Sequence, residues 1–174
     1  MTAPPSLDDL IALVLDGRHR YDGEEAVDDL AHALQAAELA RAAGAEPDLI
    51  GAALLHDIGH HPTLVAAYPL TPHEKVAATV IGPVLGERAA WVVREHVAAK
   101  RHLAATVPGY LAGLSPASRT SLERQGGPGE LPQFTTGWGP LALDLRRWDD
   151  RAKVPGAPEP GDLLDLVRGF AGTT

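Results

Sequence analysis

The chain has no cysteine and few aromatic residues, and each shortage narrows the structures open to it. Without cysteine it can form no disulfide, thiolate metal site or cysteine nucleophile, so any metal must bind histidine and carboxylate side chains. Aromatic residues make up 5% of the 174 residues, whereas alanine and leucine are abundant. Such a core suits packed helices better than a sheet, so we expect an all-α protein.

Basic residues are also scarce. Lysine and arginine number 15 against 23 acidic residues, which gives a net charge of -8 and argues against nucleic-acid binding. An anionic substrate is still possible, because a metal centre can outweigh the global charge locally. No apolar run is long enough to span a membrane. The N-terminus also lacks the basic region followed by an apolar run that is typical of a signal peptide. We therefore expect a cytoplasmic protein without a membrane partner, and the sequence leaves its oligomeric state open.

The length of 174 residues fits one domain with a single hydrophobic core. Helical periodicity and helix-end signals predict a series of helices and no strand. Their approximate ranges are 6–15, 28–43, 48–58, 72–81, 87–104, a short helix after 108, 115–125, 141–153 and 162–170. Residues 60–70 are expected to form an exposed loop, with His61 among several ordinary exposed histidines.

The pair His56-Asp57 lies in an otherwise apolar segment, ALLHDIG. A buried aspartate must be charge-paired or coordinated, although Asp57 could instead cap the next turn. Further candidate ligands lie on other segments: His32, His73, His96 and Asp149. Taken singly, each has an ordinary alternative, such as a hydrogen-bonded core histidine for His32 or a solvated charged face for Asp149. Together they occupy five segments of a helical protein, which is how helical bundles build metal sites.

Longer motifs extend this pattern along the chain. They are YDGE at 21–24, LAHALQAAELA at 30–40, AALLHDIGH at 52–60, HVAAKRHL at 96–103, LSPAS at 114–118, QGGP at 125–128 and RRWDDRAKVPG at 146–156. With these motifs, roughly residues 21–156 resemble the HD-domain superfamily, and within it the mixed-valent di-iron oxygenases that oxidise organophosphonates. The resemblance implies an all-α HD-domain helical bundle over residues 1–174.

The resemblance also implies two iron ions in a mixed-valent Fe2+/Fe3+ active form. One iron would bind His32, His56, Asp57 and Asp149. The second would bind His73 and His96, with Asp57 bridging the pair, as a carboxylate can. The sequence alone does not identify the metal or its redox state, because histidine and carboxylate sites accept several metals.

Two basic residues share a helix face with a proposed ligand. Lys100 follows His96 by four positions, and Arg146 precedes Asp149 by three. Both could be ordinary surface charges. The resemblance instead implies that substrate phosphonate contacts a set of polar side chains: Lys100, Ser118, Arg146 and Gln125. It also implies catalytic or gating roles for His60, Tyr21 and Glu24.

The expected function is therefore the O2-dependent cleavage of a carbon–phosphorus bond. The substrate would be a 1-hydroxy-2-(amino or alkylammonio)ethylphosphonate, and the products would be phosphate and an amino acid. One alternative is an HD-type phosphohydrolase that acts on a nucleotide or phosphoester through a metal-activated hydroxide. Another is a non-catalytic metal- or ligand-binding protein. Ligand spacing does not separate these functions, because their ligand sets overlap.

Overall fold

The computed structural model describes residues 4–21, 26–157, 159 and 161–171. These residues form ten α-helices, two short 3-10 helices and no strand, which confirms the predicted all-α class. The elements are α1 Leu7–Leu15, α2 Asp29–Ala42, α3 Pro47–Leu55, η1 Ile58–His60, α4 Pro62–Ala67, α5 His73–Leu85, α6 Glu87–Thr106, α7 Tyr110–Gly113, α8 Pro116–Arg124, η2 Pro132–Phe134, α9 Gly139–Arg151 and α10 Leu163–Ala171.

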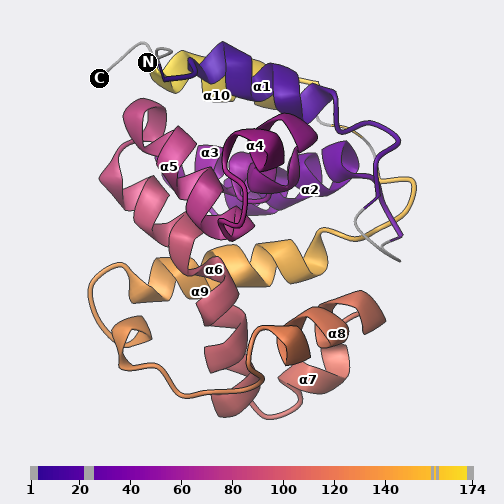
Figure 1. Cartoon of the computed structure of the whole chain (residues 1–174), viewed down its shortest axis with the longest axis vertical. Coiled ribbons are helices and arrows are strands. Elements are labelled where there is room, and N and C mark those ends of the chain that lie inside the picture. The colour runs from indigo at the N-terminus through magenta and orange to yellow at the C-terminus, as the bar shows by residue number, and fades with distance from the viewer. Residues whose placement is uncertain (1–3, 22–25, 158, 160, 172–174) are drawn as a thin grey trace.

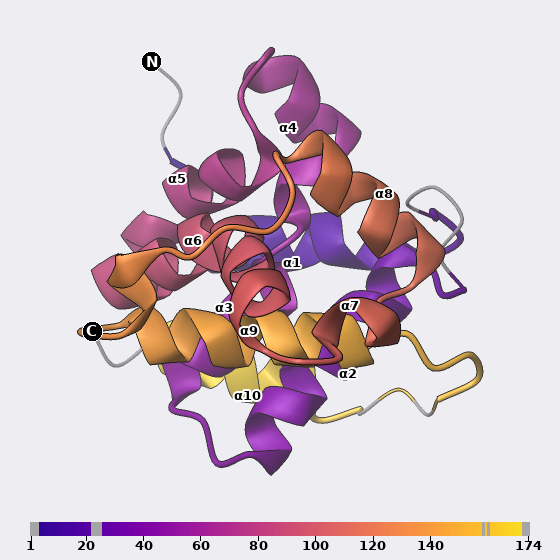
Figure 2. The same ribbon diagram turned by 90° about the horizontal axis from the view of Figure 1, so that it is seen from below.

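The helices are arranged around α3, whose residues 49–55 are all buried. Helices α2, α5, α6 and α9 pack against it, and α1 and α10 lie side by side at one end of the molecule (Figure 1). Helices α7 and α8 lie at the opposite end of the molecule, which faces the viewer in Figure 2. A helix that is apolar nearly all round belongs at the centre of such a core, as its sequence predicted.

The predicted helix over 48–58 ends earlier, at Leu55. His56 follows as its C-cap, and Asp57 has φ -100° and ψ 7°, outside the helical region. The chain then forms the 3-10 turn η1, because Gly59 packs directly against the backbone of His73 and leaves no room for a side chain. After this break the carboxylate of Asp57 lies beside His73, the first residue of α5.

The predicted exposed loop over 60–70 is partly wrong, since it contains α4. His61 is the N-cap of α4, and its Nδ1 accepts a hydrogen bond from the backbone N–H of Thr63, with Pro62 at the first helical position. The side chain of His61 is only 8% exposed, and its Nε2 lies 3.0 Å from Asp16 Oδ2. His61 is therefore a buried capping residue and not the exposed histidine expected.

Helix α5 begins at His73 with Pro72 as its N-cap, one residue after the predicted start. The helix also continues through Pro83 to Leu85, beyond the predicted end. No helix in the described part of the chain has both the length and the apolar composition needed to cross a bilayer.

Candidate metal centre

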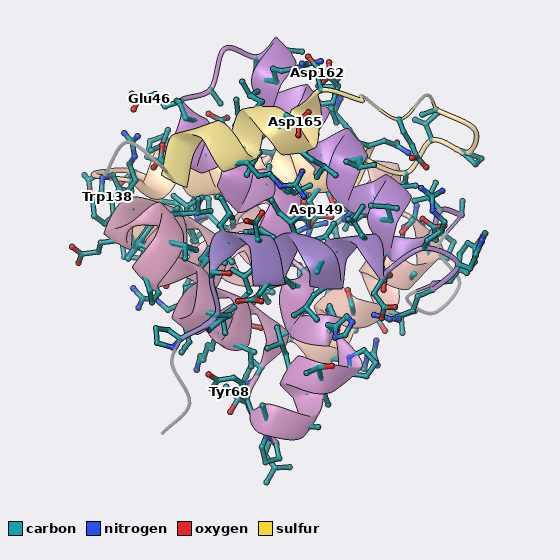
Figure 3. All side chains as sticks on the ribbon, turned by 90° about the horizontal axis from the view of Figure 1, so that it is seen from above. Glu46, Tyr68, Trp138, Asp149, Asp162 and Asp165 are labelled. Atoms are coloured by element: carbon teal, nitrogen blue, oxygen red, sulfur yellow. The ribbon has the colours of Figure 1, made fainter. Side chains whose placement is uncertain are left out.

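Two clusters of histidine and aspartate lie at the junction of five elements, and they share one residue. One cluster contains His32 of α2, the His56-Asp57 pair after α3, and Asp149 of α9; the other contains Asp57 with His73 of α5 and His96 of α6. Asp149 lies in the interior, beneath α1 and α10 as Figure 3 is viewed. The fold therefore brings together all six residues that the sequence suggested as ligands.

Asp57 joins the clusters because its two carboxylate oxygens face different histidine pairs. Oδ2 lies 3.5 Å from His32 Nε2 and 3.3 Å from His56 Nε2. Oδ1 lies 3.4 Å from His73 Nε2 and 3.5 Å from His96 Nε2. This arrangement matches a carboxylate that can bridge two metal ions.

The histidine rings are oriented by hydrogen bonds from their other nitrogen. The Nδ1–H groups of His32, His56 and His96 donate to the carbonyls of Ala152, Ala53 and Val93, at 2.9, 2.8 and 2.6 Å. A proton on Nδ1 leaves the Nε2 lone pair free to coordinate, and such partners commonly fix metal-binding histidines.

The spacing within the clusters fits metal coordination. The Nε2 atoms of His32 and His56 are 3.3 Å apart, as are those of His73 and His96. Two nitrogens at about 2.0–2.1 Å from one metal are separated by roughly 3.0–3.4 Å. Neutral rings facing each other at this distance would gain at most one hydrogen bond, whereas a cation between them satisfies both lone pairs. The donor set therefore fits two metal ions with nitrogen and oxygen ligands.

The electrostatics of the first cluster favour a positive charge. Burial acts to lower the pKa of His32 and His56, but the carboxylates of Asp57 and Asp149 outweigh it and raise these pKa values to about 9 and about 10. Burial would raise the pKa of Asp149, yet Arg146 and the nearby histidines hold it well below its usual range. Two ionised carboxylates thus face the same small space, which a metal cation would neutralise.

A large cavity of about 640 Å³ opens on the second cluster. Its wall includes Asp57, His73 and His96 together with polar side chains that could donate hydrogen bonds to an anion. Those polar side chains are Lys100, Ser118, Thr120, Ser121, Arg124, Gln125, Arg146 and Lys153. The cavity therefore joins potential metal ligands to several hydrogen-bond donors for an anion.

A smaller cavity of about 90 Å³ lies beside the first cluster, where His32 and His56 form part of its wall. The rest of its lining combines apolar side chains, which are Leu13, Val14, Val27, Ala33, Leu54 and Ile58, with charged ones that include Arg20, Asp29 and Lys153. Asp57 and Asp149 line both cavities, so the two clusters lie between them. A molecule bound in the larger cavity could extend an apolar group past the clusters into the smaller one.

The predicted substrate contacts Lys100, Ser118 and Arg146 all line the larger cavity, so the surface-charge alternative is wrong. Lys100 is only 3% exposed and Arg146 only 4%. Burial, followed by the nearby charge of Arg146, lowers the pKa of Lys100 to about 8. Gln125 also lines this cavity, and its buried Oε1 has no hydrogen-bond partner in the described part of the chain.

The residues expected to have catalytic roles are placed differently from one another. His60 lines both cavities, and its ring stacks on that of His73 with centroids 3.9 Å apart. Tyr21 does not reach the clusters, since its side chain is 54% exposed and lines neither cavity. The backbone just before Tyr21 is held by a hydrogen bond from the N–H of His19 to Asp28 Oδ2. Glu24 lies outside the described residues.

Sequence reasoning missed Lys153, which lines both cavities and whose Nζ donates to Ser118 Oγ at 3.0 Å. The backbone around it is fixed by Gln35, whose side-chain amide exchanges two hydrogen bonds with the backbone of Val154. Lys153 follows Asp149 by four positions, and the same spacing had drawn attention to Lys100 after His96. The spacing from Asp149 could therefore have identified Lys153, which the sequence analysis included only as part of the motif RRWDDRAKVPG.

Known proteins share this domain and parts of the sequence around it. The HD domain family model matches residues 29–125. Hydroxymethylphosphonate dioxygenase of Gimesia maris is 40% identical over 157 residues, covering 83% of this chain and 76% of the relative. The glycine-betaine-forming 1-hydroxy-2-(trimethylamino)ethylphosphonate dioxygenase of Leisingera caerulea is 40% identical over 117 residues, covering 64% of this chain and 59% of the relative.

An uncharacterized protein of Acanthamoeba polyphaga mimivirus is 34% identical over 151 residues, covering 79% of this chain and 68% of the relative. The family model ends before α9 and therefore does not include Asp149 or Lys153. These matches confirm the resemblance seen in the sequence motifs. The chain belongs to the HD-domain family and, within it, to the oxygenase branch that includes these phosphonate dioxygenases.

Proposed function

We propose that this enzyme cleaves the carbon–phosphorus bond of a 1-hydroxyphosphonate with O2 at a di-iron centre. The observation that carries the proposal is the position of Lys100, Arg146 and Lys153, which line one cavity together with both clusters of potential metal ligands. Cations at this position suit a phosphonate group, and its neighbouring carbon and hydroxyl would then lie at the clusters. The named relatives support the choice of oxidation over hydrolysis.

In this proposal one iron binds His32, His56, Asp57 and Asp149, and the second binds His73 and His96 with Asp57 shared. The converging Nε2 and carboxylate oxygens support both assignments. One ferric and one ferrous ion would supply chelation of the substrate oxygens and activation of O2. His and carboxylate ligands suit such iron centres, and they leave room for substrate to coordinate.

The protein side chains bind and orient the substrate. Lys100, Arg146 and Lys153 hold the phosphonate by charge-assisted hydrogen bonds, and Ser118 fixes the direction of Lys153. These contacts fix the carbon bearing the hydroxyl beside the clusters. Holding the reacting groups in one geometry removes much of the entropic barrier of a reaction between separate molecules.

We further propose that the substrate has a 2-amino or 2-alkylammonio group. The smaller cavity supports this choice, because it borders the clusters without including Lys100, and its wall combines apolar side chains with charged ones, among them the carboxylate of Asp29. The family resemblance makes Glu24, which lies outside the described residues, the predicted partner of this positive charge. The relative from Leisingera caerulea acts on a trimethylamino compound by its name, and the relative from Gimesia maris on hydroxymethylphosphonate, so both substrate types belong in the test.

The proposed reaction balances without a further reductant. A 1-hydroxyphosphonate and one O2 together contain the atoms of one carboxylic acid and one phosphoric acid. The carbon supplies the four electrons that reduce O2, and for a 2-amino substrate the acid is glycine or an N-methylated relative. Iron-loaded protein is expected to consume O2 and release phosphate in a one-to-one ratio.

The test compares 2-amino-1-hydroxyethylphosphonate, its N-methylated analogues and hydroxymethylphosphonate under air and under anaerobic conditions. 2-Aminoethylphosphonate is the matched control, since it lacks only the 1-hydroxyl and is expected to release no phosphate. A preference for hydroxymethylphosphonate would replace the proposed amine-bearing substrate with the smaller one. Phosphate release that is equally fast without O2, or from phosphate esters alone, would instead support a phosphohydrolase.

A further inference from the structure

The segment 110–124, which contains α7 and α8, supplies partners to the cations of the larger cavity. Ser121 Oγ accepts a hydrogen bond from Lys100 Nζ at 2.7 Å, and Ser118 Oγ accepts one from Lys153 Nζ at 3.0 Å. Both serines lie on α8 and both line the cavity. The directions of two cations are therefore set by hydroxyl groups of this segment.

Arg146 is held differently, between two carboxylates of its own helix. Its NH1 lies 2.6 Å from Asp149 Oδ2, and its Nε donates to Asp150 Oδ1 at 3.0 Å, with a further contact from NH2 to the same oxygen. Asp149 belongs to the first cluster, whereas Asp150 lines neither cavity. Asp150 thus fixes the guanidinium from the side away from the proposed substrate.

Tyr110 completes this chain of contacts, because its hydroxyl donates to Asp150 Oδ2. Both oxygens of Asp150 are then used, one by Arg146 and the other by Tyr110. Burial and the charge of Asp150 raise the pKa of Tyr110 above its ordinary value, although the charge of Arg146 opposes this shift. The phenol therefore stays protonated and remains a hydrogen-bond donor. Tyr110 itself lines neither cavity.

The contact is significant for α7, because none of its residues is buried and Tyr110 itself is half-buried. Arg119 of α8 donates from Nε to the carbonyl of Leu114 and from NH2 to that of Ala112, so α7 and α8 are tied together. The hydroxyl of Tyr110 then connects this unit to Asp150 of α9. Every buried cation of the cavity therefore has a direct or indirect partner on the same segment.

We propose that Tyr110 is a positioning residue for anion binding, which fixes the guanidinium of Arg146 through Asp150 without touching the substrate. Without the phenol, one oxygen of Asp150 loses its donor and the carboxylate can rotate. Arg146 can then turn toward Asp149 and present fewer N–H groups to an anion. This role depends on the proposed function in one respect: the anion is taken to be the phosphonate group of the substrate.

The test uses Tyr110→Phe in the iron-loaded full-length enzyme, with inorganic phosphate as an equilibrium probe and the phosphonate as substrate. We expect the Kd for phosphate and the KM for phosphonate to rise together by about three- to tenfold. The value of kcat should remain within about twofold, because the lost contact affects binding of the ground state and transition state alike. Iron content is expected to stay the same.

Two matched controls separate positioning from a general loss of stability. Tyr68→Phe removes a hydroxyl from a tyrosine that lines neither cavity. Asp144→Asn removes a carboxylate from the exposed face of α9, where Asp144 pairs with Arg147 at 2.8 Å. Both should bind phosphate as the parent enzyme does. Asp150→Asn breaks the same chain of contacts at a second point and is expected to match or exceed the effect of Tyr110→Phe.

A double-mutant cycle supplies the decisive result. In an Arg146→Gln background, Tyr110→Phe should weaken phosphate binding no further, since the group that it positions is absent. An undiminished effect in that background, or unchanged phosphate affinity in both Tyr110→Phe and Asp150→Asn, would overturn the proposal. Because phosphate binding is measured without turnover, failure of the oxygenase assay would count against the proposed function and leave this test intact.

Discussion

Gly59 and His73 are so close that a Cβ atom on Gly59 would lie 2.1 Å from the carbonyl oxygen of His73. The contact holds the 3-10 turn η1 against the first residue of α5. Asp57 lies two residues before Gly59, so the same contact brings its Oδ1 to 3.4 Å from His73 Nε2. The absence of a side chain at Gly59 is thus a condition for joining the two clusters.

Gly59→Ala is expected to separate η1 from α5 and weaken the second metal site. Overpacking against backbone costs about 3 kcal/mol or more, the upper end of the usual range, and should lower Tm by roughly 6–12 °C. Metal analysis and thermal melting test this result. Gly82→Ala within α5 is the control, because its Cβ would meet Ala90 of α6 at an ordinary 3.6 Å. Equal iron contents in the two variants would contradict the role given to Gly59.

The number of metal ions provides the second prediction. Protein made with ample iron should contain about two ions per chain, since two clusters of donors share Asp57. His73→Ala and His96→Ala should each reduce this toward one, because they leave the first cluster complete. Metal analysis of purified protein gives the result. If both variants keep the parent's metal content, the centre is not dinuclear.

The sequence predicted the helical class and the set of candidate ligands because both follow from local pattern. Apolar periodicity identified the helices, and a buried aspartate such as Asp57 needs a partner wherever it lies. The motifs around His96 and Asp149 then placed the chain in its family before any contact was known. The structure shows that the fold brings these residues together. Their binding of iron stays a prediction.

Long-range contacts could not be read from the sequence. His61 looked exposed beside Pro62, but its bond to Asp16 depends on how α1 and α4 pack. The end of α3 at Leu55 likewise depends on the approach of Gly59 to α5, a contact between distant segments. Tyr21 was expected at the metal by family resemblance, and the structure places its side chain mostly in solvent.

The cations of the larger cavity should control affinity for the phosphonate. Lys100→Met, Arg146→Gln and Lys153→Met are each expected to raise KM about tenfold or more, since hydrogen bonds to charged groups are worth roughly 1.5–3 kcal/mol. Steady-state kinetics measure this change. Arg147→Ala serves as the control, because Arg147 lies on the exposed side of α9 and pairs with Asp144. Parent-like KM values in all three variants would place the phosphonate elsewhere.

Glu24 allows a test of the substrate's positive charge even though it lies outside the described residues. If its carboxylate faces an ammonium group, Glu24→Gln should reduce the preference for amine-bearing phosphonates over hydroxymethylphosphonate by about fivefold or more. Iron content should not change, since Glu24 is not a proposed ligand. The ratio of kcat/KM for the two substrates is the measurement. An unchanged ratio accompanied by loss of iron would show that Glu24 has a structural role instead.

Lys100 gives the enzyme a pH dependence in substrate binding. Burial and the charge of Arg146 lower the pKa of Lys100 to about 8, although the carboxylates of Asp149, Asp150 and Asp57 partly oppose this shift. The lysine is therefore mostly protonated at pH 7 and loses its charge as pH rises through about 8, so the KM for phosphonate should increase there toward that of Lys100→Met. Lys100→Arg keeps its charge at these pH values and should lack the increase, because the guanidinium pKa exceeds 12. A KM profile from pH 6.5 to 9.5 tests this, with the pH range chosen as roughly one and a half units on either side of the pKa. The same rise in Lys100→Arg would assign the titration to another group.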